Sequence, residues 1–180
     1  MESEQEFESF SKIPRLSREC VVTEKIDGTN AQVYITDDNQ VQAGSRNRYI
    51  KPGDDNFGFA KWVEENKEEL LKLGPGRHFG EWWGQGVGRR YDLKEKRFSL
   101  FNTHRWSDPD IRPSCCDVVP VLYQGMFDTL MIEKTLSDLN AMGSQAAPGF
   151  MKPEGIVIFH AASGYLFKKT IEKDEKRKGQ

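Results

Sequence analysis

The stretch Thr23-Glu24-Lys25-Ile26-Asp27-Gly28-Thr29-Asn30 is the most informative part of this sequence. It follows the apolar pair Val21-Val22, which places its lysine at the end of an expected strand. The neutral amine of a lysine can attack a nucleoside triphosphate and hold the nucleotide as a phosphoramide. A strand-ending turn with a solvated lysine explains the same residues, because a motif as short as Lys-x-Asp-Gly also arises by chance. The rest of the sequence must therefore decide between the two interpretations.

The length and composition of the chain fit one compact domain. Its 180 residues can bury one sizeable core, and a charged fraction of 30% with a hydrophobic fraction of 37% is typical of globular proteins. No apolar run approaches a membrane span, and the acidic start at residues 1–4 is unlike a secretory signal. We therefore expect no membrane association.

The cysteines and the net charge bear on location and partners. Cys20, Cys115 and Cys116 are an odd, poorly spaced set, which argues against a disulfide framework and favours a reducing, cytoplasmic location. The formal net charge of −2 indicates that any surface for nucleic acid must be local. The basic residues available for such a surface, which could equally form a solvated face, are Arg46, Arg48, Lys51, Arg89, Arg90, Lys94, Lys96 and Arg97.

The hydrophobic pattern predicts an α+β fold with antiparallel strands and two main helices. Strands are expected at residues 20–26, 31–35, 41–46, 77–83, 97–103, 118–123, 155–160 and 164–169. One helix should begin after a cap at Asp54 or Asp55 and stop before Gly74-Pro75-Gly76, and another should cover residues 129–142. We divide the chain into an arm at 1–18 that packs on the core, a domain at 19–171 and a charged tail at 172–180.

Two polar clusters after the lysine could recognise a nucleotide. Arg46 and Arg48 lie in Gly44-Ser45-Arg46-Asn47-Arg48, where planar guanidinium groups suit a phosphate or a ribose hydroxyl. Glu81, flanked by glycines at a strand end, can accept a hydrogen bond from a ribose hydroxyl. A basic surface loop is the alternative for the first cluster, and Trp82 and Trp83 beside Glu81 could be core residues.

Three further clusters complete the set. Phe101 faces away from the main apolar row of its strand and could stack on a base, or it could be the core of a second layer. Glu154 precedes the buried strand at 155–160 and could bind Mg²⁺, or it could be a turn residue. Lys168 and Lys169 could stabilise charge on a transferring phosphate, or they could be an edge-strand pair.

The order of these clusters along the chain resembles the covalent nucleotidyltransferase superfamily, which contains DNA ligases, RNA ligases and messenger-RNA capping guanylyltransferases. The resemblance runs from about Thr23 to Thr170. It looks most like the RNA ligase branch, in particular small stand-alone RNA-ligase-like proteins, because Thr29-Asn30 trails the lysine motif and a charged tail follows Lys168-Lys169. It implies an ATP-grasp-like nucleotidyltransferase domain in which antiparallel sheets flank a nucleotide pocket.

The resemblance also implies a role for each residue. Lys25 would be the nucleophile that becomes adenylylated by ATP. The other expected contacts are Glu24 to the adenine, Asn30 to the nucleotide or the RNA end, Arg46 to the ribose or the terminal nucleotide, Glu81 to a ribose hydroxyl, Phe101 stacked on the purine, Glu154 to Mg²⁺ or Mn²⁺, and Lys168 and Lys169 to the α-phosphate.

The implied function is ATP-dependent RNA ligation, as in RNA repair. A lysyl-AMP intermediate would pass AMP to a 5′-phosphate, and a 3′-hydroxyl would then displace AMP and seal the strand. A minimal DNA ligase, a capping-type guanylyltransferase and a nucleotide-binding module without sealing activity are the alternatives. Three features depart from the family, one of which is that residues 104–147 contain no motif with an assignable role. Lys168 and Lys169 are adjacent instead of two apart, and the chain ends about ten residues later, so a partner protein could supply a missing domain.

Overall fold

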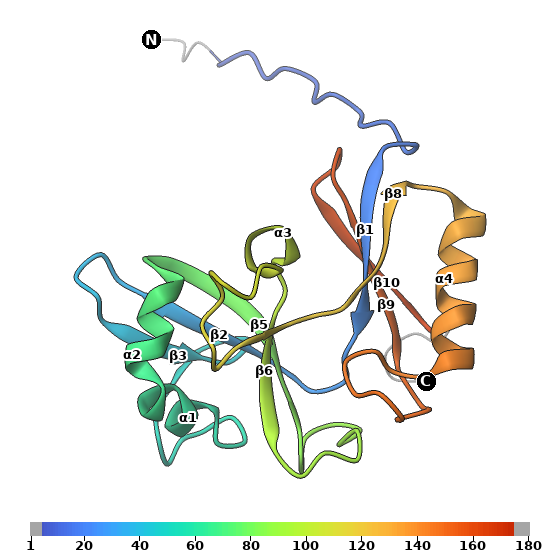
Figure 1. Ribbon diagram of the computed structural model, residues 1–180. Coiled ribbons are helices and arrows are strands. Elements are labelled where there is room, and N and C mark those ends of the chain that lie inside the picture. Colours follow the sequence, from blue (N-terminus) through green and yellow to red (C-terminus); the bar gives the residue numbers. More distant parts are fainter. Residues whose placement is uncertain (1–4, 175–180) are drawn as a thin grey trace.

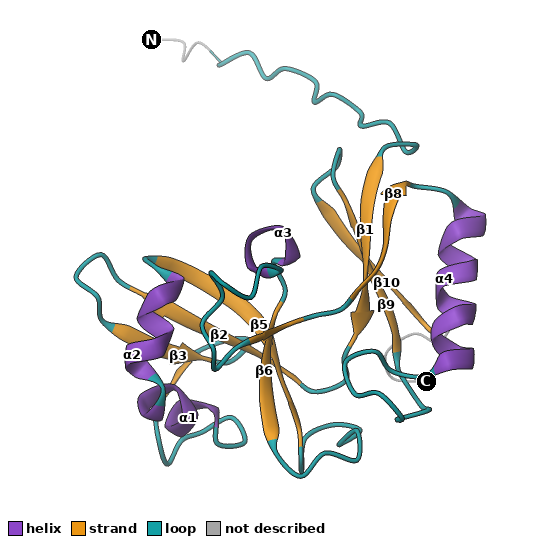
Figure 2. Ribbon diagram, in the orientation of Figure 1, coloured by secondary structure: helices purple, strands orange, loops and turns teal. Residues whose placement is uncertain are grey.

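The computed structural model describes residues 5–174, and every structural statement below refers to these residues (Figure 1). The part of the charged tail after residue 174 therefore lies outside the described residues. The chain forms a four-stranded sheet with the order β10-β9-β1-β8, here called sheet A, and a six-stranded sheet with the order β4-β3-β2-β5-β6-β7, here called sheet B (Figure 2). The predicted α+β class is confirmed.

The predicted helices and strands occur in the predicted order. The bounds of the elements are β1 Glu19–Lys25, β2 Thr29–Ile35, β3 Val41–Gly44, β4 Tyr49–Ile50, α1 Phe59–Glu65, α2 Lys67–Leu70, the 3₁₀ helix η1 Leu71–Leu73, β5 Gly76–Gly84, β6 Lys96–Leu100, α3 Thr103–Trp106, β7 Asp117–Val118, β8 Val121–Met126, α4 Thr129–Met142, β9 Gly155–His160 and β10 Tyr165–Thr170. However, β4 and α3 were not predicted, and the strands expected at 41–46 and 97–103 end at residues 44 and 100.

Sheet A is covered by α4 on the face turned away from sheet B (Figure 1). Side chains alternate along β1, so Cys20 and Val22 pack under α4 while Val21, Thr23 and Lys25 lie on the opposite face. We call that opposite face the inner face of sheet A. The helix α4 begins where Asp128 accepts hydrogen bonds from two backbone N–H groups of the first turn, and it ends at Gly143, as predicted.

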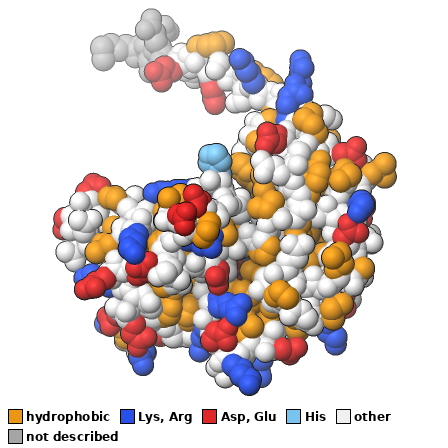
Figure 3. Space-filling view, viewed as in Figure 1, with side chains coloured by type: hydrophobic (Ala, Val, Ile, Leu, Met, Phe, Trp, Pro, Cys, Tyr) orange, Lys and Arg blue, Asp and Glu red, His pale blue; other side chains and the backbone are white. Residues whose placement is uncertain are grey.

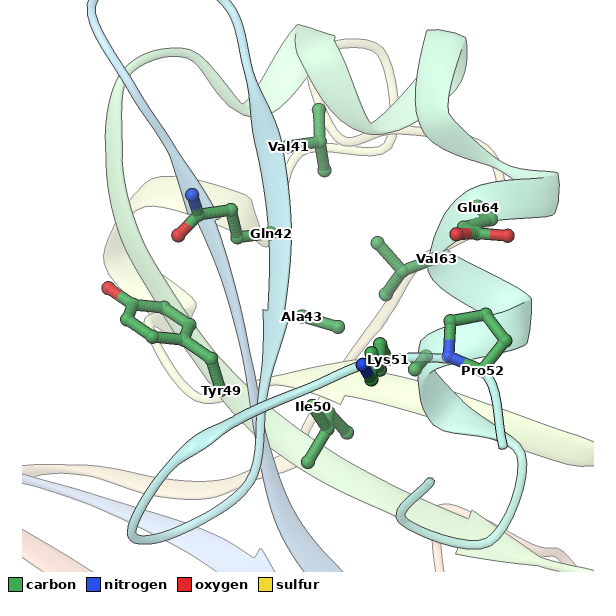
Figure 4. A pocket seen from close by; sticks show the side chains of 10 residues that line it. Val41, Gln42, Ala43, Tyr49, Ile50, Lys51, Pro52, Val63 and Glu64 are labelled. Atoms are coloured by element: carbon green, nitrogen blue, oxygen red, sulfur yellow. The ribbon is translucent and has the colours of Figure 1, made fainter. Parts of the chain in front are cut away.

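Sheet B packs its main apolar face against α1 and α2. Alternation along β2 places Ala31, Val33 and Ile35 in that core and leaves Asn30 and Gln32 on the other side, which we call the inner face of sheet B. A cavity of about 330 Å³ lies on the core side, between β3 and α1 (Figure 4). Gln42 and Tyr49 line it as well, so it lies at the β3–β4 edge of the sheet.

The first predicted helix is correct in place but broken into α1, α2 and η1. Asn66 interrupts it, because its side-chain amide donates to the Trp62 carbonyl and its backbone leaves the helical region. The predicted cap is correct in its residue but not in its position. Gly58 occupies the N-cap position, and the Asp55 carboxylate accepts from the backbone N–H groups of Ala60 and Lys61 in the first turn.

The strand predicted at 118–123 is two strands that belong to different sheets. Val118 ends β7, beside β6 in sheet B, and Val121 begins β8, beside β1 in sheet A. Pro120 separates them because it has no N–H to continue a ladder, although its carbonyl accepts from the Glu24 N–H at 3.0 Å. The chain therefore passes from sheet B to sheet A at Pro120, next to Glu24, the residue before Lys25.

The arm does not pack on the core as expected, and Figure 3 shows it extending from the body of the molecule. Phe7, Phe10, Ile13 and Leu16 are 92%, 89%, 81% and 64% exposed. Its last residues are held by a polar contact, in which the His160 ring lies 2.7 Å from the Leu16 carbonyl oxygen. Within residues 5–174 no helix combines the length and the apolar character needed to cross a bilayer.

Candidate active site

Lys25 lies at the end of β1 on the inner face of sheet A. Its Nζ donates to Oε2 of Glu154 at 2.7 Å, and the two side chains are 24% and 19% exposed. Glu154 precedes β9, whose first residue, Gly155, is the direct neighbour of Lys25 across the ladder. The structure therefore joins two residues that are 129 positions apart in the sequence. The predicted nucleophile and the predicted metal ligand form one half-buried ion pair.

The loop after Lys25 is fixed by hydrogen bonds from sheet B and its following turn. The Asp27 N–H donates to the Tyr91 hydroxyl at 2.7 Å, and Arg89 Nε donates to the Asp27 carboxylate at 3.1 Å. The Gly28 N–H donates to Glu81 Oε1 at 3.0 Å. A side chain at Gly28 would not fit, because a Cβ there would stand 2.4 Å from the Trp82 carbonyl oxygen. The glycine of Lys-x-Asp-Gly is thus needed for close approach of two chains.

The turn that holds this loop has an unusual backbone. Arg90, Tyr91 and Asp92 are three successive residues with positive φ angles of 63°, 53° and 57°. Non-glycine residues rarely adopt this conformation, and such residues often lie at functional sites. Here the conformation buries the Tyr91 ring beside Trp83 and Phe150, with its hydroxyl under Asp27. The sequence contained no motif that could have identified Tyr91.

Glu81 and Asn30 are direct neighbours on the inner face of sheet B. Arg46 reaches the same place, because its Nε and Nη2 donate to Asn30 Oδ1 at 3.0 and 2.7 Å. Phe101 follows the end of β6 and is 41% exposed, and its N–H donates to the Phe79 carbonyl in the next strand. The structure therefore brings the predicted ribose, nucleotide and purine contacts to one side of one sheet.

Burial raises the pKa of the Glu81 carboxyl to about 7, although the Gly28 N–H and the charge of Lys25 act in the opposite direction. The charges of Glu154 and Asp27 raise this pKa further. Residues of both sheets thus act on Glu81. The pKa of this carboxyl on sheet B therefore depends on charged residues at the inner face of sheet A.

This pKa predicts a pH-dependent effect of Glu81→Gln on stability. A carboxyl with a folded-state pKa of about 7 and an unfolded value of 4.5 binds more protons when folded, so its contribution to the free energy of unfolding falls as pH rises between these values. Glutamine keeps an acceptor for Gly28 but does not ionise. We expect the variant to gain stability over wild type from pH 4.5 to pH 8, by up to about 3 kcal/mol.

Urea unfolding of both proteins at pH 4.5 and pH 8 measures this difference, and other titrating groups cancel in the comparison. An equal difference at both pH values would contradict the assignment of a buried, charge-sensitive carboxyl at position 81.

The two adjacent lysines lie on opposite faces of β10. Lys168 is the ladder neighbour of Val157, which places it on the inner face with Thr23 and Lys25. Lys169 is the neighbour of Ile156 and points to the α4 side, where its Nζ pairs with Glu133 at 3.2 Å. This pairing raises the pKa of Lys169. Only Lys168 shares a face with the nucleophile.

Glu24 also points to the α4 side and is buried. Its Oε1 accepts from the Ser144 hydroxyl at 2.6 Å, and its Oε2 accepts from the backbone N–H groups of Gln145 and Ala146 at 2.8 and 2.9 Å. The structure thus does not bring this carboxylate to the inner face. It fastens the segment after α4 to the strand that carries Lys25.

Several basic residues proposed for a nucleic-acid surface have acidic partners. Arg48 pairs with Asp54, Arg97 pairs with Glu95, and Arg89 pairs with Asp27. Arg46 bonds an amide instead of a carboxylate, and it makes no ion pair with any described residue. Among residues 5–174 no group of three or more histidine, cysteine, aspartate or glutamate side chains is arranged to hold a metal ion.

Comparisons with known proteins show the family and a similar fold. A family model described as RNA ligase matches residues 18–170. The structure is similar to an RNA ligase mutant from Naegleria gruberi solved with ATP and Mn, at 22% identity and a TM-score of 0.64, over 89% of this chain and 53% of that chain. A second mutant of that ligase, solved with AMP and Mn, gives 20% identity and a TM-score of 0.66, over 90% and 53%. The chain thus spans about half the length of these structures. No curated protein sequence matches it.

Proposed function

Because the chain belongs to the RNA ligase family, we propose that it transfers AMP from ATP to an RNA end through Lys25. The observation that carries this proposal is the Lys25–Glu154 pair on the inner face of sheet A, beside a loop whose backbone is bonded to Glu81 of sheet B. This arrangement offers a nucleophile, a proton acceptor and a ribose acceptor around one space, which is the nucleotide pocket of an ATP-grasp-like ligase domain.

In the first step Lys25 Nζ attacks the α-phosphorus of ATP. The ammonium first passes one proton to its hydrogen-bond partner, Glu154, which frees the lone pair of the amine. A nitrogen–phosphorus bond then forms, the bond to pyrophosphate breaks, and the nitrogen releases a second proton to solvent. Lys168, on the same face of sheet A, offsets charge on the α-phosphate oxygens. The product is lysyl-AMP and free pyrophosphate.

A divalent cation, Mg²⁺ or Mn²⁺, fits the chemistry of Glu154. Carboxylate oxygens are preferred ligands of both ions. Of the two carboxylate oxygens of Glu154, only Oε2 accepts a hydrogen bond from a described residue. Glu154 would hold the ion together with phosphate oxygens. Such an ion supplies positive charge that offsets the charge on the phosphate.

Sheet B recognises the rest of the nucleotide in this proposal. Glu81 accepts a hydrogen bond from a ribose hydroxyl, and Phe101 offers an exposed ring to the purine. Asn30 and Arg46, already bonded to each other, contact the nucleotide or the terminal nucleotide of the RNA. Both carboxylate oxygens of Glu24 accept hydrogen bonds from the segment after α4, on the side of β1 opposite to Lys25. Any contact between residue 24 and adenine would therefore use its backbone.

In the later steps AMP passes to a 5′-phosphate of RNA, and a 3′-hydroxyl displaces AMP and seals the strand. Such an activity would serve RNA repair. A reducing compartment such as the cytoplasm suits the chain, since Cys20, Cys115 and Cys116 are free thiols. The related structures are about twice as long, so we propose that a further domain or a partner protein completes the surface for the second RNA end.

The proposal is tested by giving adenylylated protein a panel of 5′-phosphorylated ends: nicked RNA duplex, single-stranded RNA, and the same ends in DNA. We expect adenylylated 5′ ends, followed by sealed products where a 3′-hydroxyl is adjacent, with RNA preferred. Preference for nicked DNA would indicate a minimal DNA ligase, and a GMP adduct would indicate a guanylyltransferase. Nucleotide binding without transfer to any end would contradict ligation.

A further inference from the structure

A row of side chains continues from the nucleotide site along the inner face of sheet B. The β2–β5 ladder pairs Asn30 with Glu81, then Gln32 with Phe79, then Tyr34 with Arg77. Direct partners in an antiparallel ladder share a face, so Phe79, Tyr34 and Arg77 lie on the same face as Glu81. The sheet therefore extends the candidate site away from Lys25.

Tyr49 of β4 joins this row from the other side. It pairs with Gly44, which pairs with Gln32, so its ring belongs to the inner face as well. The Tyr34 and Tyr49 ring centroids are 6.2 Å apart, and the Arg77 guanidinium carbon lies 4.3 Å from the Tyr34 centroid and 5.7 Å from that of Tyr49. We call Tyr34, Tyr49, Arg77 and Phe79 the aromatic platform.

The platform is not part of the hydrophobic core. Tyr49 is 48% exposed and Phe79 is 52% exposed, whereas Val33 and Ile35, the β2 residues that point to α1, are fully buried. Tyr49 also lines the cavity between β3 and α1, and Figure 4 shows its ring on the side of β3 opposite to Val63. Packing with the helices of sheet B therefore does not require these rings.

The composition of the platform matches unpaired nucleic acid. Successive bases stack on exposed aromatic rings, and an arginine supplies a cation for the phosphates and a planar surface for stacking. Arg77 makes no ion pair within residues 5–174; its Nη1 donates to the neutral Gln32 amide oxygen at 3.2 Å. The platform itself contains no carboxylate. Its chemistry thus favours a polyanion with flat bases over an acidic peptide or a lipid surface.

We propose that the aromatic platform binds unpaired bases of the RNA strand whose end enters the nucleotide site. The platform shares the inner face with Glu81 and Arg46, so a strand bound there can lead into the nucleotide site. That this strand is the RNA to be ligated rests on the proposed function. Stacking reads the faces of bases and not the ribose, so single-stranded DNA gains from the platform as single-stranded RNA does.

Fluorescence anisotropy with a labelled single-stranded RNA oligonucleotide tests this proposal. We expect Tyr49→Ala to weaken binding about ten-fold and Tyr49→Phe to keep it, since the phenylalanine ring still stacks. Arg77→Ala should weaken binding and reduce the slope of log affinity against log salt by about 0.7. Tyr165→Ala, which removes a 68% exposed tyrosine from sheet A, is the matched control and should bind as wild type does.

The same variants also separate this proposal from the proposed function. Tyr49→Ala should form the AMP adduct at the wild-type rate, because the platform lies outside the nucleotide pocket. Single-strand binding by Lys25→Ala should remain, so a failure of AMP transfer would leave this measurement intact. If Tyr49→Ala and Arg77→Ala keep wild-type thermal stability and still bind single-stranded RNA as wild type does, the platform proposal is wrong. It is also wrong if these variants lose as much affinity for fully duplex RNA as for single-stranded RNA.

Discussion

Lys25→Ala is expected to abolish transfer of AMP from ATP, with a fall on the order of 10⁴-fold or more, the size seen when a covalent nucleophile is removed. The amine at position 25 forms the bond to the α-phosphorus. Its hydrogen-bond partner, Glu154, is a carboxylate and cannot form the phosphoramide in its place. Radiolabelled ATP followed by denaturing electrophoresis measures the bound AMP.

A second substrate isolates the effect of Lys25 from the fold. RNA that already carries AMP on its 5′-phosphate bypasses the first step, so Lys25→Ala should still seal it if wild type does. Lys67→Ala removes an exposed lysine of α2, outside both the site and the candidate nucleic-acid surface, and should behave as wild type in both assays. An AMP adduct that persists in Lys25→Ala would show that another residue is the nucleophile.

Lys168→Ala should lower the rate of adduct formation about 10²- to 10³-fold, whereas Lys169→Ala should change it less than about three-fold. The reason is the alternation of β10, which places Lys168 on the face of Lys25 and Lys169 against α4. Removing a group that stabilises developing charge on a phosphate costs transition-state energy, while removing a partner of Glu133 does not. Single-turnover kinetics with saturating ATP measure both rates.

The opposite pattern, with Lys169 essential and Lys168 dispensable, would contradict the register of β10. Lys169→Ala also loses the contact to Asp174, so its thermal stability should be measured beside its rate. Water reaches this ion pair, because the Glu133 side chain is 62% exposed and that of Lys169 is 31% exposed. Solvent screening should therefore leave it only a small contribution to stability.

The sequence predicted most strands because they depend on a local signal, whereas the roles of the site residues stay a prediction. Alternation of apolar residues has a period of two, and it identified β1 and β9 correctly. The same period implies that Lys168 and Lys169 point to opposite sides. It could not show which side faces Lys25, because that depends on pairing with β9.

Features that depend on distant contacts were not predictable. Tyr91 supports Asp27 through a left-handed turn that no residue type announces, since none of its three residues is glycine. Pro120 divides a continuous apolar run between two sheets, and only the tertiary structure assigns its two sides. The exposed platform residue Phe79 reads in sequence as an ordinary strand aromatic, because exposure is a property of the whole fold.

The central claim is that Lys25 becomes the carrier of AMP. Intact mass spectrometry of wild-type protein after incubation with ATP and Mg²⁺, followed by peptide mapping, tests it most directly. We predict a gain of one AMP, located on the peptide that contains Lys25 and lost in mild acid, as expected of a phosphoramide. No gain of mass, or an adduct on a peptide without Lys25, would contradict the account.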